Sequence, residues 1–331
     1  MYCSYQIKEY LDKILASFYV PEIELDFGNF NNSKSLKNEI LSLNHTIEFP
    51  NDSLTFNIFV DENSFKNIIQ TEINSEFHRI SEQIKNIDFL IKSKAQAAWI
   101  LVTVYYACFF MANLINRLLG RASINFSTTQ LKSIFLNDTS PPLTKKLQEN
   151  LRNLNEGSNH NYTCIIERSQ QHNFLKIRLI PGGDKPHQAV WSNLFCNLNI
   201  LDKKIENTEI KILKNIVNIS EQKFPLPSKL RNDWNYSDQK YFSRLGTETA
   251  KDFLHLIQNP NALNSWILKE SNSRNLTLKS TQEENRICSL AYVYCVLKEV
   301  FEKIVTRPSL PKNHRHLPNR LKNKKKKKRG Y

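Results

Sequence analysis

The feature that most constrains the fold of this chain is a long apolar segment about a third of the way along it. Residues 97–115 are 19 positions without a charged side chain, and four alanines are interspersed with large aliphatic and aromatic residues. A helix of that length is long enough to span a bilayer. The segment therefore belongs either in a membrane or at the centre of a helical bundle.

Two observations favour the bundle. Tyr105 and Tyr106 fall at the middle of the segment, whereas membrane helices carry such residues at their ends. Lys94 and Arg117 flank the segment equally, so no positive-inside asymmetry orients it. Small residues let neighbouring helices approach closely, and an apolar surface on all sides suits a central helix. We expect a buried helix over residues 95–120 and no membrane contact.

The rest of the chain is mostly helical in its periodicity. Apolar residues recur every three or four positions between 63 and 91, which predicts an amphipathic helix of about seven turns. Similar patterns predict helices over residues 1–20, 187–204, 208–221, 247–257 and 283–305.

β-Structure is predicted in two places. Residues 53–60 alternate as a strand does, and the runs 162–166 and 174–180, followed by Pro-Gly-Gly, indicate a hairpin. The stretch from Gly120 to Pro141-Pro142 is predicted to be loose and polar, and 143–155 to hold at most a short helix. The expected fold class is mainly α, with a small N-terminal α/β element (1–62), a helical bundle (63–305) carrying an inserted β-hairpin around 160–182, and a basic tail (306–331).

Composition excludes several kinds of chemistry. The chain has 7 glycines and neither GxGxxG nor GxxxxGK[ST], so no dinucleotide or P-loop site is expected. His314 and His316 have no further ligands at a recognised spacing, and HExxH is absent, so we expect no metal and no cofactor. The six cysteines are scattered and the N-terminus lacks a secretory pattern, which predicts reduced thiols in the cytoplasm.

The charge of the chain is concentrated at its C-terminus. The formal net charge is +14, but residues 312–331 hold ten Lys or Arg and no acid, and the remainder has 36 basic against 32 acidic residues. Such a cationic run binds polyanions through counterion release with little sequence preference. The expected contacts to RNA, or to DNA, are Lys322, Lys324, Lys325, Lys326, Lys327, Lys328 and Arg329. Nuclear import, lipid attachment and a merely solvated tail are the alternatives.

Two segments resemble one protein superfamily. The run Trp99–Asn113 (WILVTVYYACFFMAN), which follows a long amphipathic helix, resembles the second helix of HEPN-type bundles, and Arg231–Tyr236 (RNDWNY) resembles their arginine-centred motif. In active members an Arg precedes a His by four to six residues, and here Tyr236 stands in the place of that His. The likeness covers about residues 63–120 and 187–305.

The resemblance implies a helical bundle, commonly dimeric, that cleaves RNA without a metal. The 2′-hydroxyl of RNA is the nucleophile, a His moves protons, and an Arg neutralises charge on the phosphate. Arg231 is expected in the electrostatic role and Asn232 in positioning. Tyr236 is a poor general base because a phenol with a pKa of about 10 keeps its proton at pH 7.

Other interpretations of these residues remain open. RNDWNY also suits the start of a helix, with Asp or Asn as the cap and Trp234 and Tyr236 packed inward. Arg152 and His160 form a second Arg/His candidate, eight residues apart across a loop.

The sequence therefore predicts an RNA-binding HEPN-like protein, with metal-independent endoribonuclease activity in host defence or a toxin–antitoxin pair. The partners expected are RNA or DNA through the tail, and a second copy or another protein through the bundle. The alternative is a non-catalytic nucleic-acid-binding or assembly subunit.

Overall fold

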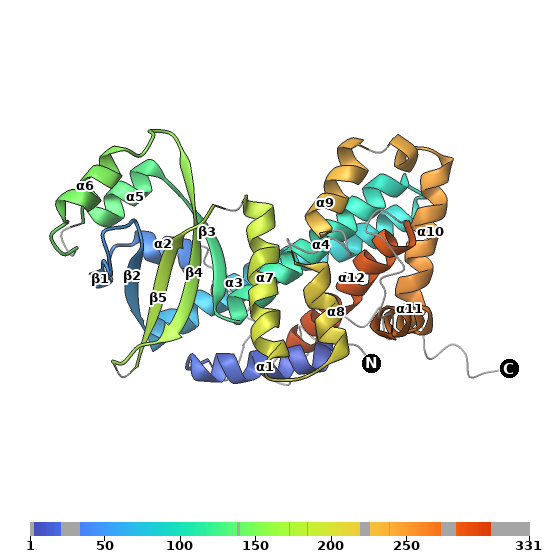
Figure 1. Ribbon diagram of the computed structural model, residues 1–331, viewed down its shortest axis with the longest axis horizontal. Helices are drawn as coiled ribbons and strands as arrows, with labels where there is room; N and C mark the ends of the chain where they lie inside the picture. Colours follow the sequence, from blue (N-terminus) through green and yellow to red (C-terminus); the bar gives the residue numbers. More distant parts are fainter. Residues whose placement is uncertain are drawn as a thin grey trace.

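The helices and the sheet form two sides of one molecule. The computed structural model describes residues 3–20, 34–137, 140–171, 173–183, 185–218, 226–237, 239–272 and 283–305. Figure 1 shows the sheet with α2, α5 and α6 on one side, and α9 to α12 around one end of α4 on the other. The described part is mainly helical, as predicted, and its strands form one small five-stranded antiparallel sheet.

The helices follow the predicted periodicity closely, with additions. Their bounds are α1 Ser4–Ser17, α2 Leu36–Leu41, α3 Glu62–Lys92, α4 Ala97–Leu118, α5 Thr128–Phe135, α6 Lys145–Arg152, α7 Pro186–Asp202, α8 Thr208–Ile216, α9 Pro227–Asn232, α10 Arg244–Gln258, α11 Pro260–Asn272 and α12 Glu283–Val305. A π-helical turn, η2, covers Asp233–Ser237, and a 3-10 turn, η3, covers Gln239–Phe242.

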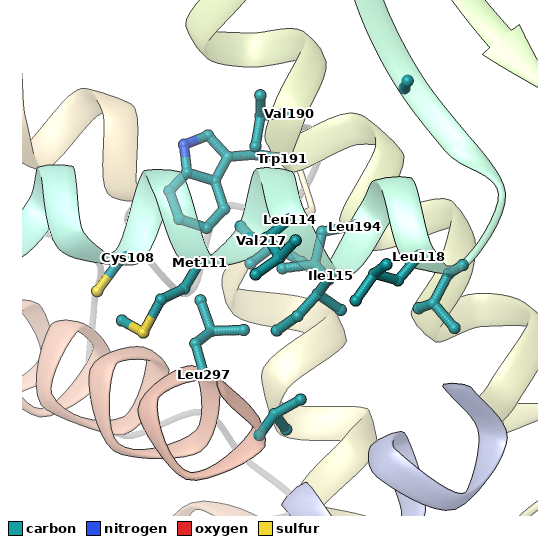
Figure 2. Close-up of a cluster of buried hydrophobic side chains, with 14 of the residues drawn as sticks. Cys108, Met111, Leu114, Ile115, Leu118, Val190, Trp191, Leu194, Val217 and Leu297 are labelled. Carbon is teal, nitrogen blue, oxygen red and sulfur yellow. The ribbon is translucent and has the colours of Figure 1, made fainter. Parts of the chain in front are cut away.

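Helix α4 is the central element of the bundle. It contacts α3, α7, α10 and α12, and most of its side chains are buried. Figure 2 shows Met111 of α4 near Leu297 of α12, and Leu114 and Ile115 close to Leu194 of α7. Among the described residues α4 is the one helix long and apolar enough to cross a membrane, and two thirds of its most apolar window is buried in the protein. This burial is that of a core helix.

Buried amides fix α7 against α4. The Asn116 side chain donates from Nδ2 to the carbonyl oxygen of Val190 at 2.8 Å, and Asn197 donates to Asn116 Oδ1 at 3.1 Å. Asn116 and Asn197 are almost fully buried, so losing either partner would leave a desolvated polar group. These bonds set the position of α7, whose first turn reaches the face of α4 described below.

The sheet joins segments that are far apart in the sequence. Its strands are β1 Ile47–Glu48, β2 Phe56–Asp61, β3 Arg121–Ser127, β4 Asn159–Arg168 and β5 Phe174–Pro181. All neighbours are antiparallel in the order β1-β2-β5-β4-β3. In one row Phe56, Leu179, Cys164 and Ala122 lie opposite one another, and all four are buried. The predicted hairpin is thus the centre of a sheet that also includes the predicted N-terminal strand.

The prediction of a loose polar stretch after Gly120 is wrong. Strand β3 and helix α5 occupy it, because Ala122, Ile124 and Phe126 alternate toward the core and Ser127 begins α5 with a capping box to Gln130. Helix α2, whose N-cap is Ser35, lies between the helix predicted over residues 1–20 and the strand predicted over 53–60, where no helix was expected.

Gly120 connects the bundle to the sheet. Its φ of +81° lies in the left-handed region, and an added Cβ would come within 2.8 Å of the Phe18 ring. Its carbonyl oxygen accepts from the amide of Ile166 at 2.9 Å. Both the backbone conformation and the close approach therefore require glycine at this junction.

Gly120→Ala is expected to destabilise the fold by at least about 2 kcal/mol, from backbone strain plus the clash with Phe18. Gly157→Ala is the matched control, because Gly157 has a φ of +75° but nothing within 4 Å of an added Cβ. It should cost only about 1 kcal/mol. Urea unfolding followed by circular dichroism measures both, and equal losses would contradict the role of the Phe18 contact.

Candidate functional site

Arg231 lies at the end of a short helix whose neighbours are firmly packed. Helix α9 begins with Pro227 at its first turn and passes directly into η2. Trp234 in η2 is fully buried and packs edge-on against Tyr241. Asp233 accepts from Arg286 of α12 at 3.1 Å. The turn is therefore anchored on one side, while Arg231 and Tyr236 lie on the other.

The guanidinium of Arg231 is held by aromatic groups and an amide. Nη2 donates to Tyr106 Oη of α4 at 2.7 Å, and Nη1 donates to Asn232 Oδ1 at 2.8 Å. The guanidinium carbon lies 5.6 Å from the Tyr106 ring centre and 5.5 Å from that of Tyr236. Within the described ranges no carboxylate lies at ion-pairing distance from Arg231, so its charge stays available for an anion.

His187 contacts the same tyrosine as this arginine, although it is 44 positions earlier in the chain. It occupies the first turn of α7, after Pro186, and its Nδ1 is 2.9 Å from Tyr105 Oη. Its ring centre is 4.7 Å from that of Phe109 and 6.1 Å from that of Tyr106. Tyr106 thus contacts both Arg231 and His187.

The protonation of His187 follows from this setting. Partial burial lowers the pKa of His187 below its usual value, and the nearby positive charge of Arg231 lowers it further. Burial raises the pKa of Tyr105, so this phenol keeps its proton. At neutral pH His187 is therefore an uncharged imidazole with a tyrosine on Nδ1. A neutral imidazole, which can accept a proton, and a guanidinium, which can bind a phosphate, thus both contact Tyr106 at one face of α4.

The predicted site residues divide into two groups. Arg231, Asn232 and Tyr236 lie together, and Tyr236 is 72% exposed, so the interpretation that packed it inward is wrong for Tyr236 and correct for Trp234. Arg152 and His160 lie elsewhere: α6 and β4 are on the sheet side in Figure 1, away from α9.

His160 has a structural contact on β4. Its Nε2 lies 3.0 Å from Thr128 Oγ1, and that hydroxyl donates to the carbonyl oxygen of Asn155 at 2.6 Å. These bonds connect the start of α5 to β4. Arg152 is an exposed residue at the end of α6. The predicted pair therefore does not supply the histidine that the Arg231 motif lacks.

The predicted nucleic-acid contacts of the tail, Lys322, Lys324–Lys328 and Arg329, lie outside the described residues, as do His314 and His316. Within the described ranges there is no group of three or more His, Cys, Asp or Glu side chains that could hold a metal ion.

Sequence inspection missed His187 because a motif search looks a few residues beyond the arginine. The single local signal is that His187 follows Pro186, which marks the first turn of a helix. Its proximity to Arg231 depends on how α7 and α9 pack on α4, and no sequence spacing encodes that packing.

The chain matches no family model, no curated protein and no solved structure.

Arg231→Met should raise the pKa of His187, because it removes a positive charge that opposes protonation while keeping most of the side-chain volume. The measurement is a pH titration of the His187 ring resonances by NMR, assigned with His187→Gln. In the wild type the midpoint should lie below 6.5. Arg152→Met is the control and should leave the midpoint unchanged. A midpoint that Arg231→Met does not move would show that the two groups are not coupled.

Proposed function

We propose that this protein is a cytoplasmic HEPN-like RNA-binding protein that cleaves RNA without a metal ion at the Arg231–His187 site. The observation that carries the proposal is that an arginine with no carboxylate of the described residues at ion-pairing distance and a neutral histidine both contact Tyr106. The central α4 with the motif Arg231–Tyr236 against it supports the HEPN-like assignment. A second copy or partner protein on the bundle stays a prediction.

Each group has a defined task in this reaction. The imidazole of His187 takes the proton of a ribose 2′-hydroxyl, and the 2′-oxygen attacks the adjacent phosphorus. The P–O5′ bond breaks, a 2′,3′-cyclic phosphate forms, and the departing 5′-oxygen takes a proton from water. Arg231 binds the non-bridging phosphate oxygens and stabilises the charge that builds on them. Tyr106 and Asn232 hold the guanidinium in place.

A second candidate is a non-catalytic RNA-binding or assembly subunit. The observation that favours it is Tyr236, which takes the place of the motif histidine and stacks on Arg231 with most of its surface exposed. Tyrosine and arginine together suit the binding of a base and its phosphate without any proton transfer. The two candidates share one surface and differ in whether RNA is cut.

Purified protein should cleave RNA in EDTA, and both Arg231→Ala and His187→Ala should lower the rate at least about a hundredfold, because each removes one catalytic group. With His187 as the base, the wild-type rate should rise with pH through the lowered pKa of His187 and reach its plateau at a lower pH than a histidine with the usual pKa would give. The products, resolved on a sequencing gel, should end in 2′,3′-cyclic phosphate.

Arg152→Ala and His160→Ala are the matched controls, because they remove the same residue types from the sheet side of the molecule. Both should cleave at the wild-type rate. RNA that stays intact in EDTA across several substrates, but is bound in a manner that Arg231→Ala weakens, would establish the second candidate instead. RNA that is neither cut nor bound through Arg231 would overturn both.

A further inference from the structure

Helix α4 carries aromatic side chains on a face that the described residues cover only in part. Trp99, Thr103, Tyr106 and Phe110 follow one another at spacings of four, three and four residues, which places them along one side of a helix. We call these four residues the α4 strip. None of them is fully buried, whereas the positions between them are mostly in the core. The strip extends about 17 Å from Trp99 to Phe110.

Cations lie over the rings of this strip. Arg231 lies between Tyr106 and Tyr236, and the guanidinium of Arg79 from α3 is 6.0 Å from the centre of the Phe110 ring. Arg79 is anchored from below, because its Nη1 donates to the buried carboxylate of Glu76 at 3.2 Å. Its side chain nevertheless remains 57% exposed. Two arginines are therefore oriented at separate points on the strip.

The far end of the strip is an exposed aromatic pair. Trp99 is 50% exposed and meets Phe242 of η3 edge-on at 6.4 Å between ring centres. The exposed part of the Trp99 ring, next to Phe242, offers a flat apolar surface on which a planar ligand can stack. Nucleobases are such ligands, and the phosphates between them complement the arginines.

We propose that the α4 strip is a binding track for single-stranded RNA, with unpaired bases stacked at Trp99 and Phe110 and a phosphate at Arg231 between them. The inference rests on the proposed function, since it lays the reacting strand across Arg231, and it adds contacts that lie outside the basic tail. Duplex RNA does not fit, because its bases are already stacked on one another and hidden from side chains.

The fluorescence of Trp99 reports directly on the binding of RNA to the α4 strip. The chain has four tryptophans, and Trp191, Trp234 and Trp266 are buried. Stacking of a base on Trp99 should therefore quench the exposed component of the fluorescence. The probe is a single-stranded RNA with 2′-O-methyl riboses, which lack the nucleophile and stay intact. Quenching should saturate with the oligonucleotide and disappear in Trp99→Phe.

Affinity is measured in parallel with the full-length protein and a labelled oligonucleotide. Raised salt weakens contacts of the tail, which depend on counterion release, more than it weakens stacking. Under those conditions Trp99→Leu and Phe110→Leu should each weaken binding about tenfold. Tyr5→Leu is the control, because Tyr5 is an exposed ring of α1 with Lys303 over it, away from the strip. It should bind as the wild type does.

The possible results separate this inference from the cleavage reaction. Absence of quenching, unchanged affinity in both strip variants, or equal affinity for duplex RNA would each overturn the track. If Phe110→Leu fails to fold, the affinity of Trp99→Leu and the fluorescence quenching of the wild type still test whether RNA binds to the α4 strip. Strip variants that bind weakly while the wild type cuts no RNA would support the track and reject cleavage. If the wild type cleaves RNA and the strip variants bind it normally, the binding track would be rejected and the cleavage reaction would still be supported.

Discussion

The burial of α4 is the constraint on which the rest of this structure depends. A helix with 19 consecutive uncharged residues cannot remain in water, so α3, α7, α10 and α12 cover it on most sides. The last residue of α4, Leu118, is separated from the first residue of β3, Arg121, by two residues, so the sheet is connected directly to the same helix. Covering α4 thus brings together segments from almost the whole described chain, and it determines where the first turn of α7 and the end of α9 lie.

The incomplete coverage of α4 is as informative as its burial. One side of the helix keeps partly exposed rings, and Arg231 and His187 reach that side from two different helices. Neither would be well placed without α4, because Tyr105 and Tyr106 supply the hydroxyls that contact them. The ring of Tyr105 is fully buried and that of Tyr106 partly so, and both residues reach the candidate site through their hydroxyls. This arrangement explains why aromatic residues, and not aliphatic ones, occupy the middle of an apolar helix.

The sequence was sufficient to predict the elements that depend on local periodicity. Helix α3 runs from Glu62 to Lys92 where the stripe of apolar residues predicted it, and the hairpin of β4 and β5 lies where two alternating runs flank a polar link. Helix α4 was predicted from the length of its uncharged run, and the mid-segment tyrosines and the equal flanking charges favoured a bundle over a membrane. The group Arg231, Asn232 and Tyr236 was found through its resemblance to a motif.

Features that depend on long-range packing could not be found in this way. Strand β3 was missed because three inward residues, Ala122, Ile124 and Phe126, are a weak signal until β4 pairs with them. The pairing of β2 with β5 crosses more than a hundred residues, which no local pattern reports. His187 was missed for the same reason. Arg152 and His160 were proposed as a pair only because they are close in sequence, and the structure does not place them near Arg231.

We propose that nucleic acid binds this protein on the partly exposed face of α4 and not only on its basic tail. The most direct measurement is ultraviolet crosslinking of a single-stranded RNA to the full-length protein, with the crosslinked peptides identified by mass spectrometry. We expect crosslinks in residues 97–118 and 226–242, at Trp99, Tyr106, Tyr236 or Phe242, and these crosslinks should persist when salt is raised. Crosslinks confined to residues 306–331, and lost at raised salt, would contradict it.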